Sequence, residues 1–467
     1  MGIKAILTAM CPGPLKPVMD RIEASPIGFR LAQGAFWSMA GAVVSRSLML
    51  FASILIARIL GKTGFGELGI IQSTVGMFGV FAGFGLGLTA TKHVAEFRTK
   101  DPARAGHVIA LSGLVALITG GAMAVTLATF STWLAVHTLA APQLTGLLRI
   151  GAIMLFLEAI NGAQIGALSG FEAFRHIAIV NLWGGLAAFP LMVAGAYTAG
   201  LQGAVWGLVG SRAISWLLNH LALRQAAARY SVPLSFACCW QERSVLWSFS
   251  LPAALSGIMV TPVSWACNAL LVNQPNGYGE MGILNAANQW RNLLLFLPSL
   301  LSSVLLPVLS HSSSQSHGFA RAFEIAHRLT LVLVLPVSLL LMLAAPWLIA
   351  MYGRDFHTGR TAMVYSVAAA AVFAIGSQAG TAITARSRMW LGFLINTSHA
   401  GLYLLLSLCL VARLGAAGIA LSLLIAYVCL TLWGYCYLYP QLPPRVFQRT
   451  IMATVVITLA AVAVSAF

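Results

Sequence analysis

Apolar stretches long enough to cross a membrane recur along most of this chain, and only short polar breaks separate them. A helix needs roughly 20 apolar residues to cross a bilayer, where its backbone polar groups must be satisfied internally. Only 8% of the residues are charged, whereas a soluble domain has about 25%. The sequence therefore predicts an all-α integral membrane protein, almost no part of which could fold in water.

The apolar stretches predict twelve transmembrane helices. They lie near residues 34–59, 67–91, 108–130, 147–168, 177–197, 202–223, 249–272, 280–309, 325–350, 361–384, 389–411 and 416–438. A further apolar stretch covers residues 450–467. At 18 residues it is near the lower limit for a span, so the chain has twelve or thirteen transmembrane helices.

The formal charge of +16 would suggest nucleic acid as a partner in a soluble protein. The basic residues instead cluster in alternate loops, as the positive-inside rule predicts. With the N-terminus in the cytoplasm, 18 of the 27 Lys and Arg lie on the cytoplasmic side, 6 on the opposite side and 3 within spans. We therefore expect a multi-pass membrane protein with a cytoplasmic N-terminus and no nucleic-acid partner.

One octapeptide occurs twice. GFGELGII at 64–71 reappears as GYGEMGIL at 277–284, an offset of 213 residues. Two later glycine pairs repeat at an offset of 215 residues: Gly200 with Gly203, and Gly415 with Gly418. Six spans separate the copies, so both halves cross the membrane in the same direction. Parallel repeats of this kind occur in transporters whose substrate site lies between the halves.

The repeat predicts two six-helix bundles around a central cavity. The expected segments are a cytoplasmic tail at 1–30, an N-terminal bundle at 31–224, a cytoplasmic linker at 225–248, a C-terminal bundle at 249–439, and a terminal segment at 440–467 that could hold the extra span. The first 30 residues lack an apolar core with a small-residue cleavage site, so we do not interpret them as a signal peptide.

Three arginines lie within predicted spans: Arg46, Arg212 and Arg291. A cation at the bilayer centre costs at least ~2.5–3.5 kcal/mol, so each needs a partner, a wet cavity or a ligand. Glu158 is the only acidic residue deep in a span, and we expect it to pair with Arg212. The other guanidinium groups suit phosphate, although a misplaced span limit could explain any one of them.

Two helix faces carry further polar candidates. On the eighth span, Asn285, Asn288, Gln289 and Asn292 share one face, which continues toward Ser299 and Ser303. These amides could bind sugar hydroxyls or only a neighbouring helix. On the fourth span, Glu158 and Asn161 share a face with Gly162, Ile165 and Ser169, and Glu158 could take part in proton coupling or only in an ion pair.

Common enzyme motifs are missing from the sequence. There is no GxxxxGK[ST] phosphate loop, HExxH metal pair or GxSxG elbow, and the ten histidines are scattered. The seven cysteines form no CxxC pair. We therefore expect no enzyme activity, no bound metal and no cofactor.

Four segments carry a resemblance to a known family. ILIARILGKTGFGELGIIQSTVGMFGVFAGFGLGLTATKHVAEF at 54–97 resembles the N-terminal signature of the Wzx-type O-antigen and polysaccharide flippases. These form the polysaccharide transporter branch of the multidrug/oligosaccharidyl-lipid/polysaccharide (MOP) exporter superfamily. ALSGFEAFRHIAIVN at 167–181, SLPAALS at 250–256 and YGRDFHTG at 352–359 are similar at corresponding positions. The resemblance covers roughly residues 30–440.

The resemblance implies a specific activity. Two six-helix bundles in a V shape would enclose a cationic cavity in the bacterial inner membrane. They would move a polyprenyl-diphosphate-linked oligosaccharide from the cytoplasmic to the periplasmic leaflet by alternating access. The product would feed O-antigen, exopolysaccharide or capsule assembly, with a polymerase and a chain-length regulator as pathway partners. The three span arginines fit such a substrate by type and depth.

Three other functions stay open at this point. An antiporter of cationic drugs in the same superfamily would need unpaired carboxylates, whereas the spans hold one acid and three bases. A lipid II flippase of the superfamily would be distinguished by whether its loss is lethal or only removes a surface polysaccharide. A membrane glycan polymerase or glycosyltransferase would need a long periplasmic loop or an acidic pair, and the sequence shows neither.

Overall fold

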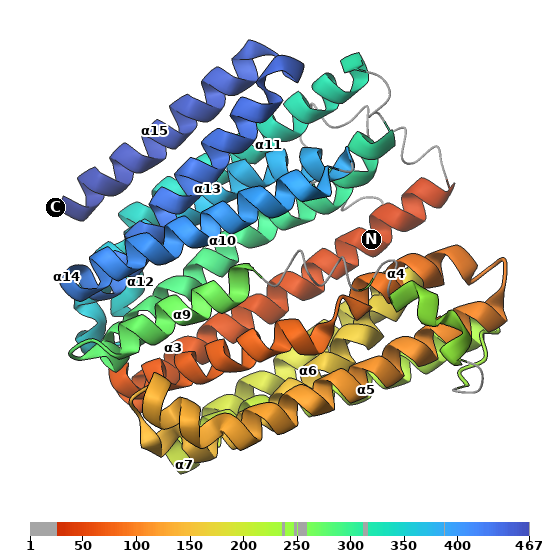
Figure 1. Cartoon of the computed structure of the whole chain (residues 1–467), viewed down its shortest axis with the longest axis horizontal. Coiled ribbons are helices and arrows are strands. Elements are labelled where there is room, and N and C mark those ends of the chain that lie inside the picture. The colour runs from red at the N-terminus through yellow and green to blue at the C-terminus, as the bar shows by residue number, and fades with distance from the viewer. Residues whose placement is uncertain are drawn as a thin grey trace, which may run out of the picture.

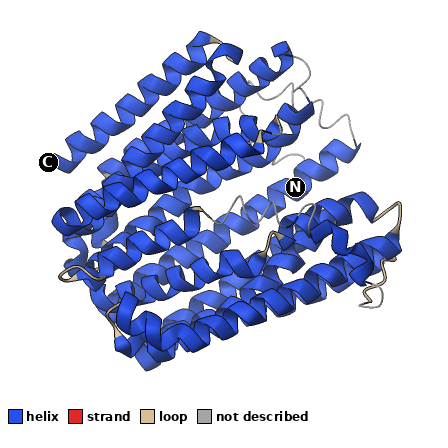
Figure 2. Cartoon of the chain, in the orientation of Figure 1, coloured by secondary structure: helices blue, strands red, loops and turns tan. Residues whose placement is uncertain are grey.

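The computed structural model describes residues 26–235, 239–246, 250, 259–311, 316–386 and 388–466, and its regular elements there are all helices (Figure 2). The helices longer than one turn are α3 Pro26–Gly83, α4 Leu86–Phe97, α5 Pro102–Trp133, α6 Thr145–Gly170, α7 Phe174–Arg229, α9 Val260–Val272, α10 Gly277–His311, α11 Ser316–Leu343, α12 Ala345–Ala350, α13 Arg360–Ala385, α14 Met389–Leu438 and α15 Pro444–Ala466. Short π and 3₁₀ turns lie at Leu134–Thr138, Pro142–Leu144, Cys239–Arg243, Arg354–Gly359 and Tyr439–Gln441.

Eight helices of the described part are long and apolar enough to cross a membrane. The prediction of an all-α membrane protein is therefore confirmed. α15 has 23 residues, more than the 18 of its apolar stretch, because its helix begins before that stretch. The total of twelve or thirteen crossings stays a prediction. Most of the predicted tail and the start of the predicted seventh span lie outside the described residues.

Three of the long helices bend sharply at glycine. α3 is non-helical at Gly61, α7 at Ala199 and Gly200, and α14 at Gly415. All three glycines have positive φ, which costs a residue without Cβ little. Each bend separates two arms that correspond to two predicted spans. Gly200 (φ 57°, ψ −137°) and Gly415 (φ 54°, ψ −129°) adopt nearly the same conformation, as the internal repeat predicts.

The helices fall into two groups in Figure 1. α3 to α7 pack on one another and form the N-half, and α9 to α15 pack on one another and form the C-half. The two halves meet mainly where α3 packs against α10 and α9. α15 lies at the edge of the C-half, against α13 and α11 (Figure 1). The predicted domain limits, including the linker at 225–248, stay a prediction.

α13 lies in the centre of the C-half. Residues 367 to 372, the run VAAAAV, are all 0% exposed. Alanine side chains let neighbouring helices approach closely, as small residues do in other membrane helix bundles. α10, α11 and α14 all pack against this helix, so it holds together the half that carries α15.

The two copies of the repeated octapeptide pack against each other across the halves. A Cβ atom on Gly66 of α3 would collide with the carbonyl of Tyr278 on α10, and one on Gly282 of α10 would collide with the carbonyl of Lys62. Only glycine allows backbones to come this close. The repeated glycines therefore bring the halves into direct backbone contact.

Hydrogen bonds also join the two halves at this end of the molecule, which we call the closed end. Asn273 Nδ2 donates to the carbonyl of Thr138 at 2.7 Å, and the Tyr278 hydroxyl donates to the carbonyl of Leu139 at 2.7 Å. Arg58 Nε donates to the carbonyl of Met351 at 2.7 Å. Each bond joins the N-half to the C-half. The predicted topology places this end outside the cytoplasm.

Candidate functional site

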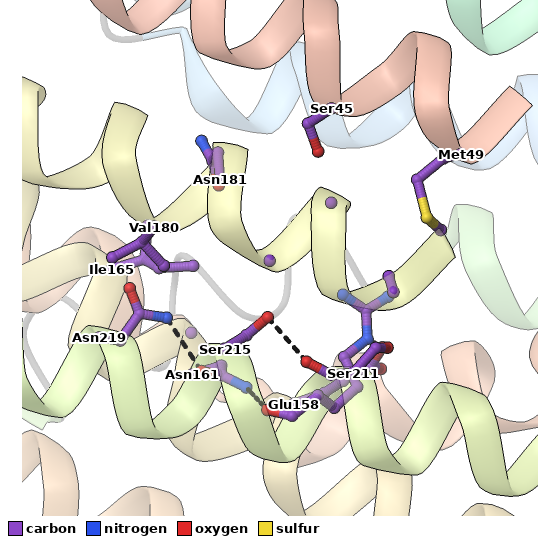
Figure 3. A pocket seen from close by; sticks show the side chains of 15 residues that line it. Ser45, Met49, Glu158, Asn161, Ile165, Val180, Asn181, Ser211, Ser215 and Asn219 are labelled. Carbon is purple, nitrogen blue, oxygen red and sulfur yellow. Dashed lines mark hydrogen bonds and ion pairs between the residues drawn. The ribbon is translucent and has the colours of Figure 1, made fainter. Parts of the chain in front are cut away.

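A cavity of about 380 Å³ lies inside the N-half, between α3, α6 and both arms of α7. Its polar lining includes Glu158 and Asn161 from α6, Asn181 from the first arm of α7, and Arg212 and Asn219 from the second arm. Figure 3 shows that Ser45 and Met49 of α3 face it from the opposite side. Gly162 and Ile165 also line it, so most of the predicted polar face of the fourth span borders this space.

The ion pair predicted in this region is confirmed. Arg212 Nε lies 3.0 Å from Glu158 Oε1, and the two side chains are 40% and 29% exposed. The bend at Gly200 turns the second arm of α7 back along α6, which brings these two residues together. Glu158 thus neutralises the one arginine that lines the cavity.

Amide and hydroxyl groups continue from this pair along the cavity wall. Asn219 Nδ2 donates to Asn161 Oδ1 at 2.9 Å, and Asn161 Nδ2 donates to the carbonyl of Arg212 at 3.1 Å. Ser215 Oγ donates to the carbonyl of Ser211 at 2.9 Å (Figure 3). These groups both donate and accept, which suits a polyhydroxylated ligand.

Asn161 was the only one of these amides and hydroxyls to be predicted from the sequence. Ser211, Ser215 and Asn219 recur every fourth residue, so they share one helix face. That spacing was a usable signal for a polar face on α7. Ser45 and Asn181 had no such signal, because neither belongs to a series of polar residues at helical spacing.

Arg46 lies where the two halves meet. Its Cζ atom is 4.2 Å from the ring centroid of Phe296 on α10, and its Nη1 atom is 3.5 Å from the carbonyl oxygen of Asn292. The side chain is exposed, and no carboxylate of the described residues forms a salt bridge with it. Its neighbour Ser45 lines the N-half cavity, so Arg46 stands beside that cavity with its charge uncompensated.

Arg291 lies in a third place, within the C-half. It is half-buried and lies near Tyr403 and Tyr427 of α14, of which Tyr403 is buried and Tyr427 half-buried. Its Nε atom is buried without a hydrogen-bond partner, and none of the described carboxylates pairs with it. The structure therefore distributes the three predicted arginines over the N-half cavity, the contact between the halves and the C-half.

The amide face of α10 is only partly open. Asn285 is buried against Gly69 of α3, and its Nδ2 donates to the carbonyl of Phe65 at 3.4 Å. It thus bonds to a neighbouring helix in this conformation. Asn288 and Gln289 are half-buried and Asn292 is exposed, so these three remain the accessible candidates.

Among the residues that the structure describes, no three or more His, Cys, Asp or Glu side chains form a group that could hold a metal ion. Five cysteines within the described ranges are free: Cys239, Cys267, Cys409, Cys429 and Cys436.

The chain matches two protein-family models. Residues 31–313 match the model of the family described as polysaccharide biosynthesis protein. The chain belongs to this family. Residues 292–467 also match the family model described as lipid II flippase MurJ. The two matched ranges overlap within α10 and together cover all but the first 30 residues.

One curated relative and two solved structures extend the likeness. A lipid III flippase of Escherichia coli (strain K12) is 24% identical over 288 residues, which cover 60% of this chain and 67% of the relative. An inward-facing multidrug resistance MATE family transporter of the MOP superfamily has a TM-score of 0.70 at 16% identity, covering 87% of this chain and 98% of its own. Lipid II flippase MurJ in an inward closed conformation has a TM-score of 0.69 at 14% identity, covering 92% and 96%. This multi-pass membrane protein therefore has the same fold as these two solved structures.

Proposed function

We propose that this chain is a flippase that moves a polyprenyl-diphosphate-linked oligosaccharide from the cytoplasmic to the periplasmic leaflet of the bacterial inner membrane. The observation that carries the proposal is a cavity lined by amides and hydroxyls beside an arginine with no carboxylate partner among the described residues. Sugar hydroxyls need the first feature and a diphosphate needs the second. The family match and the flippase relative support the same substrate class.

The parts of the substrate require different environments. A diphosphate and several sugars cannot cross hydrocarbon unaided, whereas a polyprenyl tail can stay in it throughout. Arg46 binds the diphosphate between the halves, with Arg291 and Arg212 as further cationic candidates. Asn161 of the cavity and Asn288, Gln289 and Asn292 of α10 contact the sugars. The tail passes through a lateral gap between the halves.

Alternating access gives the contacts of the closed end a function. The contacts at the closed end shield the substrate from the periplasm while it enters from the cytoplasm. The two six-helix bundles, at 31–224 and 249–439, then rock to break these contacts and release the substrate. A polymerase and a chain-length regulator of the same pathway receive the product.

The energy source follows from the charge of the substrate. Outward movement of an anion is favoured by an inside-negative potential, by ~2.3 kcal/mol per charge per 100 mV. Glu158 could add proton coupling, since protonation would release Arg212 from the ion pair. A flux that persists after the pH gradient is collapsed would argue against this coupling.

Substitution of Arg46 tests the anion site. We expect Arg46→Ala to reduce surface-polysaccharide display about 10–100-fold, the loss corresponding to charge-assisted hydrogen bonds of about 1.5–3 kcal/mol. Arg46→Lys should retain part of the activity. Arg413→Ala, at an exposed arginine of α14, is the matched control. If Arg46→Ala and Arg291→Ala both gave wild-type surface-polysaccharide display at normal protein abundance, the proposed anion site would be wrong.

One alternative rests on a specific observation, the match of the C-terminal 176 residues to the lipid II flippase model. Lipid II also joins a polyprenyl diphosphate to sugars, so the same arginines would serve it. Depletion of the protein separates the two functions, because loss of lipid II transport is lethal whereas loss of a surface polysaccharide is not. A cationic-drug antiporter is disfavoured, since the carboxylate of the cavity is already paired with Arg212.

A further inference from the structure

A contact between a cation and an aromatic ring joins the two halves of the protein. Arg46 belongs to α3 of the N-half, and Phe296 belongs to α10 of the C-half. The guanidinium Cζ atom of Arg46 lies over the phenyl ring, 4.2 Å from its centroid. Phe296 is only 6% exposed, whereas Arg46 is exposed. The ring is therefore a fixed, buried surface on which a long and flexible side chain rests.

This contact holds Arg46 without neutralising it. An aromatic face attracts a cation through its quadrupole, so it adds no net negative charge and accepts no conventional hydrogen bond. The guanidinium group has five N–H donors. One of its nitrogens, Nη1, lies 3.5 Å from the carbonyl oxygen of Asn292, beyond the usual range of a hydrogen bond. Arg212 differs, because its Nε atom lies 3.0 Å from the carboxylate of Glu158.

Holding the side chain in place has a thermodynamic consequence. A free arginine side chain populates many rotamers, and ordering it when a ligand binds opposes association. Phe296 restricts these rotamers before an anion arrives, so less conformational entropy is lost on binding. The attraction between the cation and the ring face strengthens this restriction. A buried ring that never touches the anion can thus raise the affinity of the arginine beside it.

We propose that Phe296 is a positioning residue for the anion site: its ring holds Arg46 ready to bind the diphosphate group of the lipid-linked substrate. This inference rests on the proposed function and adds to it a residue from the opposite half. The ring lies under Arg46 only while α3 and α10 keep this relative position. The two halves therefore build the anion site together.

Fluorinated phenylalanine at position 296 of the full chain tests the proposal. Fluorine withdraws electron density from the ring face but changes the size of the ring little, so the attraction for a cation falls while the packing is kept. Binding of undecaprenyl diphosphate to the purified protein in detergent is the measurement. We expect the affinity to fall stepwise from one to three fluorines, reaching about 3–10-fold below wild type. Phe296→Leu should lose about as much, whereas Phe296→Tyr should keep the affinity.

Phe97 provides the matched control, because its ring lies under Arg104 at the same distance of 4.2 Å, in a pair that the proposed site does not include. The same fluorinated series at position 97 should leave binding unchanged. In an Arg46→Ala background, Phe296→Leu should cause no further loss.

Two results would overturn the role of Phe296 while leaving the anion site of Arg46 in place. One is an affinity that does not change along the fluorinated series at position 296. The other is an equal loss from Phe296→Leu with and without Arg46. If Arg46→Ala itself bound undecaprenyl diphosphate as tightly as the wild type, the anion site of the proposed function would be wrong, and the role of Phe296 with it.

Discussion

At the scale of single residues, the charge of the N-half cavity depends on Glu158. Its carboxylate lies 3.0 Å from Arg212 Nε, so the cavity itself is close to neutral. The uncompensated positive charge stands next to it, on Arg46, whose guanidinium group rests over Phe296. An anionic headgroup is therefore expected to bind first at Arg46, and Arg212 contributes only when its ion pair opens.

Replacement of Glu158 tests whether the ion pair keeps Arg212 from binding the anion. Glu158→Gln keeps the shape of the side chain but frees Arg212, so the affinity for undecaprenyl diphosphate in detergent should rise about 5–10-fold, which corresponds to ~1 kcal/mol. Binding to the purified variant is the measurement. Gln143→Ala, which removes a 3.2 Å contact to Glu67 elsewhere in the N-half, serves as a control. Unchanged or weaker binding by Glu158→Gln would contradict the inference that the ion pair with Glu158 keeps Arg212 from binding the anion.

The sequence is sufficient to predict the contacts of some of these residues but not of others. Glu158 and Arg212 could be paired in advance, because a lone carboxylate at bilayer depth has few possible partners. The surroundings of Arg291 could not be predicted, since the direction in which a face of α10 points depends on how α10 packs against α3 and α14. Asn285 illustrates the same limit, because its amide bonds to Phe65 instead of lining an open space.

At the scale of elements, the bends at Gly200 and Gly415 decide how the paired arms of α7 and α14 lie. The repeat predicted that these two glycines correspond, and their shared conformation agrees with that prediction. Their surroundings differ. A Cβ atom on Gly200 would meet nothing within 4 Å, whereas one on Gly415 would meet the carboxylate of Glu280. That carboxylate accepts from the backbone N–H of Ala416 at 2.9 Å and so caps the second arm of α14.

Alanine at these positions should therefore have unequal effects. Gly200→Ala forces a side chain into the left-handed region and should lower the free energy of unfolding by about 1–2 kcal/mol. Gly415→Ala adds displacement of the Glu280 cap, so its loss should be larger. Thermal unfolding of the purified variants measures both. Gly146→Ala, in a helix with open space around it, should be neutral or slightly stabilising, and equal losses at 200 and 415 would contradict the role of Glu280.

At the scale of the whole molecule, the contacts of the closed end are those that the proposed transport cycle must break. Backbone contact at Gly66 and Gly282 and the hydrogen bonds of Asn273 and Tyr278 hold the halves together at this end. The apolar spans and the repeat predicted two halves in one orientation, and the described helices do pack as two groups. They did not predict that the repeated octapeptides pack on each other, because packing between distant segments leaves no periodic signal in either one.

Cross-linking the closed end tests whether it must open. Thr138 and Asn273 belong to different halves and are joined by a 2.7 Å hydrogen bond, so a cysteine pair at these positions should cross-link once the seven native cysteines are replaced by serine. If the halves rock apart during transport, flipping of the lipid-linked oligosaccharide should fall to background after cross-linking and return on reduction. A pair at Glu67 and Gln143 lies at the same end but within the N-half, and its cross-link should leave transport intact because those segments move together. Full transport with Thr138 and Asn273 covalently joined would mean that the substrate leaves by another route, and the two halves would then need no relative motion at this end.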